Sequence, residues 1–462
     1  MTDGLESQPP MPGPIARTSK RGFARRATLL LVPASLNLGV AAILAPAVNA
    51  ILARGENPEE AIGGYAVALG IIMLVALPQM RIQQMTLVFL DDGVSLARLR
   101  RFTATSALIV ALLAAIVALT PIRDLVLQRV FSLSGVLESE ARAALLALLP
   151  LPALAVARPH LYGCAIRLGH TRYVWAGTIV GMGTVILTAL VLQLSGTVEG
   201  AAVGAFAVSA AALAEVLVMI WLTGPALRRE LPSAPDDGAG TEYASMVRFF
   251  MPLLFAGFLA TVTPPVINAA VARTSTPETS IAAIAIALSV SQFLTIILWG
   301  LQPTVLALLG QGHDPRRIRL FANAIGLLVM VLAMFFAFYP PATVFILRDL
   351  VGVEGRLFES AQLGMRIFAP LPLILAQEQI FSSALMRVRR TRRILYINLI
   401  RLASLIAFVL IGLNLVDAPG VVLGIGAIAF TLVVEAGATY VYGRSAMSAL
   451  SSAWSNAAAL TS

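Results

Sequence analysis

The chain contains the stretch Pro46-Ala47-Val48-Asn49-Ala50-Ile51-Leu52-Ala53-Arg54, and a second copy follows as Pro265-Val266-Ile267-Asn268-Ala269-Ala270-Val271-Ala272-Arg273. The copies are separated by 265 − 46 = 219 residues. Further identities keep this offset: Pro33 on Pro252, Pro58 on Pro277, Glu59 on Glu278, Leu69 on Leu288 and Gln83 on Gln302. Later the offset is 220, with Pro150-Leu151-Pro152 on Pro370-Leu371-Pro372 and Glu215 on Glu435. The sequence therefore predicts an internal duplication.

The composition is that of a membrane protein. Apolar residues make up 58% of the 462 residues, and charged residues make up 12%. A soluble protein of this length needs more charge to cover its surface, and many apolar windows here reach the roughly 20 residues that a bilayer span requires. The formal net charge of +9 lies mainly in short loops between apolar segments. The positive-inside rule accounts for that charge, so no nucleic-acid partner is expected.

The sequence predicts an all-α polytopic membrane protein with twelve transmembrane helices. The predicted spans are 27–52, 62–82, 102–122, 143–166, 173–195 and 200–223 in the first half, and 248–272, 280–303, 319–342, 362–386, 393–414 and 419–442 in the second. The domains that follow are a basic cytoplasmic tail at 1–26, an N-terminal six-helix lobe at 27–224, a polar cytoplasmic linker at 225–246, a C-terminal six-helix lobe at 247–444 and a cytoplasmic tail at 445–462.

Loop charges predict the orientation. Most arginines between spans fall on one side, as at Arg98, Arg228, Arg316 and Arg390. Both termini are therefore expected in the cytoplasm, with the chain in a bacterial-type inner membrane or a plasma membrane. Six spans per half is an even number, so the two repeats are parallel and related by a pseudo-twofold axis along the membrane normal. In transporters built this way the substrate binds at the repeat interface while the lobes rock around it.

Several kinds of chemistry find no support. Cys164 is the only cysteine, so an intrachain disulfide is excluded. His160, His170 and His313 show no metal-ligand spacing, and no Walker-type loop is present. Nothing resembles a set of nucleophile, base and orienting residue. The sequence therefore predicts no metal site, no cofactor and no enzymatic activity.

Ionisable residues inside the predicted spans are the main candidates for a functional site, because such groups are costly in a membrane. They are Arg158, Glu215, Glu378, Arg401 and Glu435. Each lies about eight residues from the cytoplasmic end of its span, which is roughly 12 Å of helix. Glu378 and Arg401 lie on consecutive antiparallel helices and are expected to form an ion pair, and Arg158 is expected near Glu215. These pairs either pin helices within a lobe or bind an anionic substrate, with a carboxylate taking up a proton or cation.

Four further residues complete the candidate substrate-binding or coupling set. Arg366 lies nearer the outer end of span 362–386 and shares a helical face with Gln377, eleven residues on. Asn49 and Asn268 lie beside Pro46 and Pro265 in the two copies of the repeated stretch. Each Asn can bind a carbonyl group freed by the proline or line an outer cavity.

Several segments resemble the progressive ankylosis (ANK) protein family, within the multidrug/oligosaccharidyl-lipid/polysaccharide (MATE-like) exporter superfamily. Similar segments are Pro265-Val266-Ile267-Asn268 with Val271-Ala272-Arg273, Leu87-Val88-Phe89, Arg366-Ile367-Phe368, Arg401 and Tyr440-Val441-Tyr442. The likeness extends from about Arg26 to Arg444. The chain departs from the family at Trp299-Gly300-Leu301-Gln302-Pro303, where no charged residue occurs, and in lacking a long acidic tail.

The resemblance implies a MATE-like fold and the export of small anions such as pyrophosphate, citrate, other organic acids and nucleotide phosphates. The leading hypothesis is therefore a secondary-active exporter of small organic or phosphate-bearing anions, working by alternating access with coupling to a proton or cation. The competing hypotheses are a flippase for a lipid-linked sugar, an extruder of amphiphilic cations, and a membrane scaffold without transport. Polar residues at membrane depth argue against the scaffold.

Overall fold

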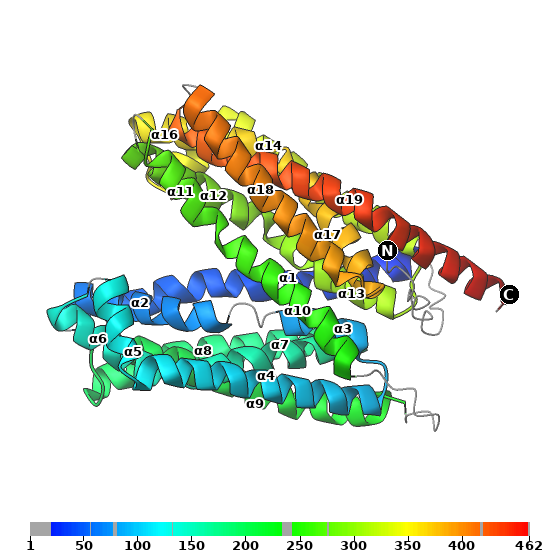
Figure 1. Ribbon diagram of the computed structural model, residues 1–462, viewed down its shortest axis with the longest axis horizontal. Helices are drawn as coiled ribbons and strands as arrows, with labels where there is room; N and C mark the ends of the chain where they lie inside the picture. The colour runs from blue at the N-terminus through cyan, green and yellow to red at the C-terminus, as the bar shows by residue number, and fades with distance from the viewer. Residues whose placement is uncertain are drawn as a thin grey trace. The chain divides into compact units, whose positions relative to one another are not determined.

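The computed structural model describes residues 20–55, 57–76, 81–131, 133–232, 243–274, 277–415 and 419–460 (Figure 1). The regular elements in these ranges are helices, and no strand occurs in them. The predicted all-α class is therefore confirmed.

The first half of the chain forms α1 (Lys20–Leu52), α2 (Pro58–Ala76), α3 (Ile82–Phe89), α4 (Gly93–Leu119), α5 (Ile122–Asp124), the π-helix η2 (Leu125–Val130), α6 (Gly135–Ala147), α7 (Leu151–Leu168), α8 (Thr171–Ser195) and α9 (Ala201–Glu230). The second half forms α10 (Tyr243–Thr261), α11 (Thr263–Val271), α12 (Pro277–Trp299), α13 (Leu301–Gly310), α14 (Pro315–Phe338), α15 (Pro340–Val344), the π-helix η3 (Phe345–Leu350), α16 (Gly355–Phe368), α17 (Leu371–Arg387), α18 (Thr391–Leu415) and α19 (Gly420–Leu460).

Capping residues explain several helix ends. Asp92 and Ser95 form a capping box at the start of α4, which satisfies backbone N–H groups that have no partner inside the helix. Asp314 accepts a hydrogen bond from the backbone N–H of Arg316 at the start of α14, at 2.9 Å. Gly169 follows α7 with φ of 84°, a left-handed conformation that favours glycine at a helix C-terminus.

The duplication seen in the sequence governs the helix boundaries. Helices α7 and α17 begin at Leu151 and Leu371, and α8 and α18 begin at Thr171 and Thr391, so both pairs keep the offset of 220. The two π-helices begin at Leu125 and Phe345, again 220 residues apart. Helix α1 is continuous where its counterpart is divided into α10 and α11.

The helices suit a membrane. In the described ranges nine helical spans are long and apolar enough to cross a bilayer, and the pair α6 and α7, bent by 45°, makes a tenth. The remaining two predicted spans correspond to α1 and to the pair α16 and α17. In the repeat, α1 is the counterpart of α10–α11, and the pair α16 and α17 is the counterpart of α6 and α7. Both of these counterparts are long and apolar enough to cross a bilayer. The chain is therefore a multi-pass membrane protein, and the repeat brings the count to twelve spans.

The chain divides into two compact units, and both divisions fall inside a helix. One unit is residues 36–250; the other is residues 1–35 with 251–462. In the second unit, Phe23 at the start of α1 contacts Phe321 of α14, with ring centroids 6.3 Å apart. In the first unit, Tyr243 at the start of α10 contacts Phe102 of α4 at 5.6 Å. Helix packing rather than chain order therefore decides where residues 20–35 of α1 and 243–250 of α10 belong. The lobes at 27–224 and 247–444 stay a prediction.

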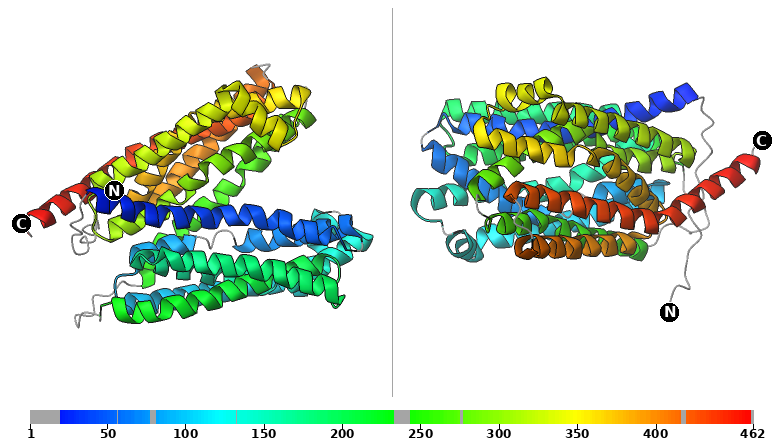
Figure 2. Two further views of the ribbon diagram at one scale, coloured as in Figure 1. Left: turned by 180° about the vertical axis from the view of Figure 1, so that it is seen from behind. Right: turned by 90° about the horizontal axis from the view of Figure 1, so that it is seen from above.

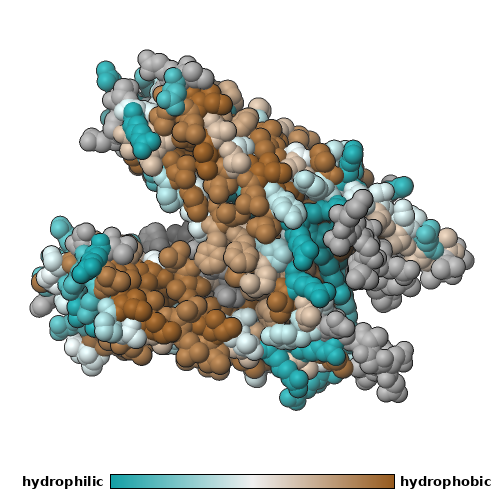
Figure 3. Space-filling model, viewed as in Figure 1, coloured by the Kyte–Doolittle hydropathy of each residue, from teal (hydrophilic) through white to brown (hydrophobic). Residues whose placement is uncertain are grey.

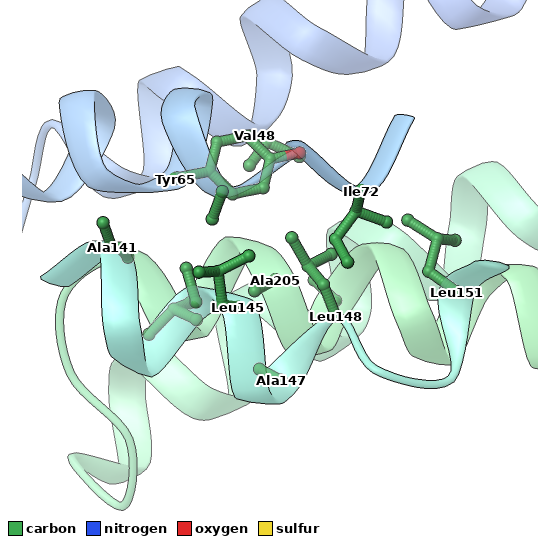
Figure 4. Packing of buried hydrophobic residues seen from close by; sticks show 14 of the residues in the cluster. Val48, Tyr65, Ile72, Ala141, Leu145, Ala147, Leu148, Leu151 and Ala205 are labelled. Atoms are coloured by element: carbon green, nitrogen blue, oxygen red, sulfur yellow. The ribbon is translucent and has the colours of Figure 1, made fainter. Parts of the chain in front are cut away.

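Each unit has its own apolar core. In the unit of residues 36–250, Tyr65 and Ile72 of α2 pack against Leu145 and Leu148 near the end of α6 (Figure 4). In the other unit, α14, α17, α18 and α19 lie alongside one another (Figure 2), and α11, α12 and α16 contribute further buried side chains. On the face shown in Figure 3 apolar side chains cover the middle of the helices, and polar ones gather near their ends. This distribution suits helices that cross a lipid bilayer.

Helices extend into two of the polar segments predicted from the sequence. Helix α9 continues through Pro225 to Glu230, so the predicted linker 225–246 begins as helix, and its residues 233–242 lie outside the described ranges. Helix α19 continues to Leu460, so the predicted tail 445–462 is helical as far as it is described. Of the predicted tail 1–26, residues 1–19 lie outside the described ranges. Charge and polarity mark where a membrane span ends, but a helix can continue into water beyond that point.

Candidate functional site

Arg158 and Glu215 form an ion pair in the unit of residues 36–250. Arg158 lies on α7 and Glu215 on α9, and Arg158 Nη1 donates to Glu215 Oε2 at 3.1 Å. The two side chains differ in exposure, since that of Arg158 is 37% exposed and that of Glu215 is 7% exposed. The predicted proximity is therefore confirmed. A buried carboxylate thus binds an arginine whose side chain is more exposed than its own.

Glycines on α8 lie against α9 at the level of the buried carboxylate. A β-carbon at Gly181 would lie 3.5 Å from Glu215 Oε2, an ordinary contact distance, and one at Gly177 would lie 3.0 Å from Met219 Sδ. Helix α8 therefore passes close to α9 here, and the tighter approach is to Met219.

In the second unit Arg401 of α18 is paired with Glu435 of α19. Arg401 Nη1 lies 3.3 Å from Glu435 Oε2 and 3.5 Å from Oε1, and Nη2 donates to the Thr263 hydroxyl at 2.9 Å. The side chains of Arg401 and Glu435 are 20% and 14% exposed. One guanidinium therefore joins three helices, because Thr263 is the first residue of α11.

Arg401 is paired with Glu435, and the expected approach of Glu378 to Arg401 stays a prediction. Glu378 and Arg401 lie on consecutive helices, α17 and α18, but position along a helix does not fix which face of it a side chain occupies. The Glu378 carboxylate accepts a hydrogen bond from Gln379 Nε2 at 2.5 Å. A carboxylate that binds Arg401 directly is therefore that of Glu435.

The carboxylates of the two ion pairs occupy equivalent positions of the repeat, but their arginines do not. Glu215 and Glu435 are repeat counterparts, since 215 + 220 = 435. The counterpart of Arg158 is Glu378, and the counterpart of Arg401 is Gly181. One half therefore supplies its arginine from α7 and the other from α18, so the pairs tie together different helices.

Two side-chain hydrogen bonds join α17 to neighbouring helices. Gln377 of α17 donates a hydrogen bond to Asn323 of α14, and Gln302 Nε2 of α13 donates to Ser382 Oγ of α17 at 3.4 Å. Asn323 is not among the residues predicted from the sequence, although an asparagine amid the apolar residues of α14 is a visible signal. Thr263 is not among them either, because threonine is common in membrane helices.

Arg366 lies at the end of α14 rather than beside Gln377. It is exposed on α16, its Nε donates to the Ala337 carbonyl at 3.4 Å, and its guanidinium stacks on Phe338. In the first half Arg123 binds the counterpart carbonyl, that of Ala118, at 3.3 Å. Arginine near the C-terminus of a helix is favourable because it satisfies carbonyl groups and complements the helix dipole.

The predicted common face of Arg366 and Gln377 is not found, because α16 ends at Phe368 and α17 begins at Leu371. Two prolines explain this break. Pro370 precedes α17 and Pro372 is among its first residues, where the missing N–H groups are tolerated.

The two asparagines of the repeated stretch differ in exposure. Asn49 is half-buried near the end of α1, and Asn268 is exposed on α11. In the described part of the chain neither side chain forms a hydrogen bond. The hypothesis that they bind carbonyl groups freed by the prolines is therefore not supported, and lining a cavity stays a prediction.

The fold is that of solved MATE-type transporters. No protein-family model and no curated protein matches the chain. A MOP superfamily transporter from Pyrococcus furiosus, described as having a binding pocket of reverse polarity, is 13% identical, with 94% of this chain and 99% of that chain covered and a TM-score of 0.73.

Two further solved structures are similar. An outward-facing multidrug resistance MATE family transporter is 14% identical, with 94% and 97% of the two chains covered and a TM-score of 0.70. The Vibrio cholerae MATE transporter VcmN in its bent form is 15% identical, with 95% and 100% covered and a TM-score of 0.71. The chain therefore shares the all-helical fold of MATE transporters of the MOP superfamily.

Proposed function

We propose that this protein is a secondary-active exporter of small organic or phosphate-bearing anions that works by alternating access. The observation that carries the proposal is the pair of arginines held at membrane depth, one in each half. Arg158 and Arg401 each bind a carboxylate, and the two carboxylates, Glu215 and Glu435, are repeat counterparts.

Arginine suits an anionic cargo for two reasons. Its charge persists at any cellular pH, and its planar fork of N–H groups matches the oxygens of a carboxylate or phosphate. An arginine at the centre of a membrane helix costs about 2.5–3.5 kcal/mol by insertion scales, so it needs compensation. Glu215 and Glu435 supply that compensation when no cargo is bound. An anion that displaces one of these carboxylates takes over the same arginine.

The displaced carboxylate gives a route to coupling. A buried carboxylate whose arginine has bound cargo needs another positive partner, and a proton or a cation would supply it. Glu378 is a second candidate for this role, because it is an ionisable group inside a predicted span. Anion binding and cation uptake would then be linked events in one transport cycle.

The resemblance to the ANK protein family supports citrate, pyrophosphate and nucleotide phosphates as cargo. The similar Pyrococcus furiosus transporter is described as having a binding pocket of reverse polarity that suggests a different function. In the present chain the positive charges inside the helices are the feature that favours anions.

A multidrug cation extruder is the second candidate function, because one of the similar structures is a multidrug resistance transporter. Glu378 and its amide neighbours would then bind the cationic cargo. A flippase for a lipid-linked sugar remains the third. Both termini are proposed to be cytoplasmic, on the basis of the arginine-rich loops on one side.

Transport by purified protein in liposomes tests the proposal. Vesicles that carry radiolabelled citrate or pyrophosphate, with and without a proton gradient, are compared for wild type, Arg158→Gln, Arg401→Gln and Arg366→Gln. The first two variants are expected to lose at least about tenfold in rate, since a charge-assisted hydrogen bond to cargo is lost. Arg366→Gln is the matched control, because Arg366 binds a backbone carbonyl at a helix end. Equal rates in all four proteins would reject the role of both arginines, and export of ethidium in place of the anions would favour the multidrug function.

A further inference from the structure

The backbone between α10 and α11 is interrupted in a way that its counterpart is not. Pro264 and Pro265 have no N–H group, so the carbonyl groups four residues earlier lose their helical donors. Helix α10 accordingly ends at Thr261 and α11 begins at Thr263. In the first half a single proline, Pro46, occupies the corresponding place, and α1 passes through it as helix. The junction is one residue long, and Val262 keeps helical dihedral angles there, with φ of −76° and ψ of −21°.

Arg401 binds the residue that follows this junction. Its Nη2 donates to the hydroxyl of Thr263, directly after the break, at 2.9 Å, while its Nη1 binds Glu435. The repeat counterparts of Thr263 and Arg401 are Leu44 and Gly181, so the first half has neither member of this contact. The second half thus combines a broken helix with a side-chain tether at the break, and the first half has an unbroken helix without one.

We infer that Thr263 is a positioning residue that couples occupancy of Arg401 to the geometry of the break between α10 and α11. The inference rests on the proposed function, in which an anion binds Arg401. An anionic oxygen is a stronger acceptor for the guanidinium than a neutral hydroxyl. Anion binding therefore withdraws the Arg401 donor from Thr263, and α11 is released to change its angle to α10. Removal of the anion restores the tether.

Hydrogen exchange at the break tests the inference. Purified wild type, Thr263→Val, Thr263→Ser and Arg401→Gln are compared in nanodiscs with and without citrate, following peptides that cover residues 255–271. Valine has nearly the shape of threonine without the hydroxyl, and serine retains the hydroxyl. Wild type is expected to exchange faster when citrate is added. Thr263→Val is expected to exchange at least about tenfold faster without citrate and to show no further change. Thr263→Ser is expected to behave as wild type.

Transport separates a positioning role from a merely structural one. Thr263→Val is expected to lower kcat with KM within about threefold of wild type, because the anion still finds Arg401 but no longer controls the break. If Thr263→Val exchanges at the wild-type rate and calorimetry shows that it binds citrate, the inference is overturned and the proposed function stands. If citrate and pyrophosphate do not bind wild type, the anion proposal fails. In that case faster exchange in both Thr263→Val and Arg401→Gln upholds the tether, and unchanged exchange in both overturns it.

Discussion

Arg158 and Glu378 occupy equivalent positions on α7 and α17, since 158 + 220 = 378, and they carry opposite charges. The duplicated fold therefore places a cation in one half where it places an anion in the other. The carboxylates at Glu215 and Glu435 are common to both halves. Because the arginine that binds each carboxylate comes from a different helix, the halves are equivalent in architecture and distinct in chemistry.

The ion pair of Arg158 and Glu215 leads to a prediction about stability. Arg158→Gln leaves the buried carboxylate of Glu215 without its charged partner and is expected to destabilise the protein by about 1–3 kcal/mol. Glu215→Gln removes the charge that compensates Arg158, so it is expected to destabilise the protein by a similar amount. Thermal unfolding in detergent measures both. Unchanged melting temperatures in both variants would contradict this account.

Two glycines of α2 make a matched pair for testing helix packing. A β-carbon at Gly64 would lie 2.8 Å from the backbone nitrogen of Ala141 and 2.7 Å from the β-carbon of Glu140, whereas one at Gly70 meets nothing within 4 Å. Gly64→Ala is therefore expected to destabilise the protein by about 1–3 kcal/mol through overpacking. Gly70→Ala is expected to stabilise it by about 0.5–1 kcal/mol through helix propensity. Similar melting temperatures for the two variants would mean that α2 and α6 are less closely packed than described.

His313 predicts a pH dependence of stability. It lies in the turn between α13 and α14, it is 2% exposed, and its Nε2 has no hydrogen-bond partner in the described part of the chain. Burial, assisted by the charges of Arg26 and Arg317, lowers the pKa of His313 from 6.5 to about 4. Between these two pH values the unfolded chain binds a proton that the folded chain does not, so stability falls as the pH is lowered.

The variant His313→Phe isolates this contribution. Phenylalanine cannot be protonated and can retain the edge contact with Phe23, whose ring centroid lies 5.6 Å from that of His313. Between pH 7 and pH 5 wild type is expected to lose about 2 kcal/mol more than the variant. Unfolding curves recorded at both pH values measure the difference. Parallel losses in the two proteins would show that His313 is protonated in the folded state.

A hydrogen bond near the end of α19 predicts a structural role for the segment 445–462, which the sequence analysis describes as a tail. The indole N–H of Trp454 donates to the carbonyl of Gly312 at 3.0 Å, in the turn between α13 and α14. Trp454→Phe keeps the ring and removes the donor, so it is expected to cost about 0.5–1.5 kcal/mol. Proteolysis at the end of α19 should accelerate in parallel. Ser455→Ala serves as the control, because the Ser455 hydroxyl binds a carbonyl of its own helix.

The sequence by itself determined the class, the duplication and the depth of the charged residues. Apolar composition and span length follow from the thickness of the bilayer, so they can be counted along the chain. The repeat offset predicted corresponding helices, and the structure has them at Leu151 and Leu371 and at the two π-helices. The sequence also predicted the neighbouring pair of Arg158 and Glu215, because α7 and α9 each carry one charged residue at the same level.

Tertiary structure alone decided which partner each of the other groups has. Position along a helix gives depth, but the direction of a side chain depends on how the helix is rotated against its neighbours, and small shifts of packing determine that rotation. Arg401 therefore binds Glu435 and Thr263, which its position along α18 did not indicate, and Arg366 caps α14 rather than sharing a face with Gln377. Residues 20–35 of α1 and 243–250 of α10 likewise belong to the unit they pack against, because burial of side chains such as Phe23 and Phe250 does not follow chain order.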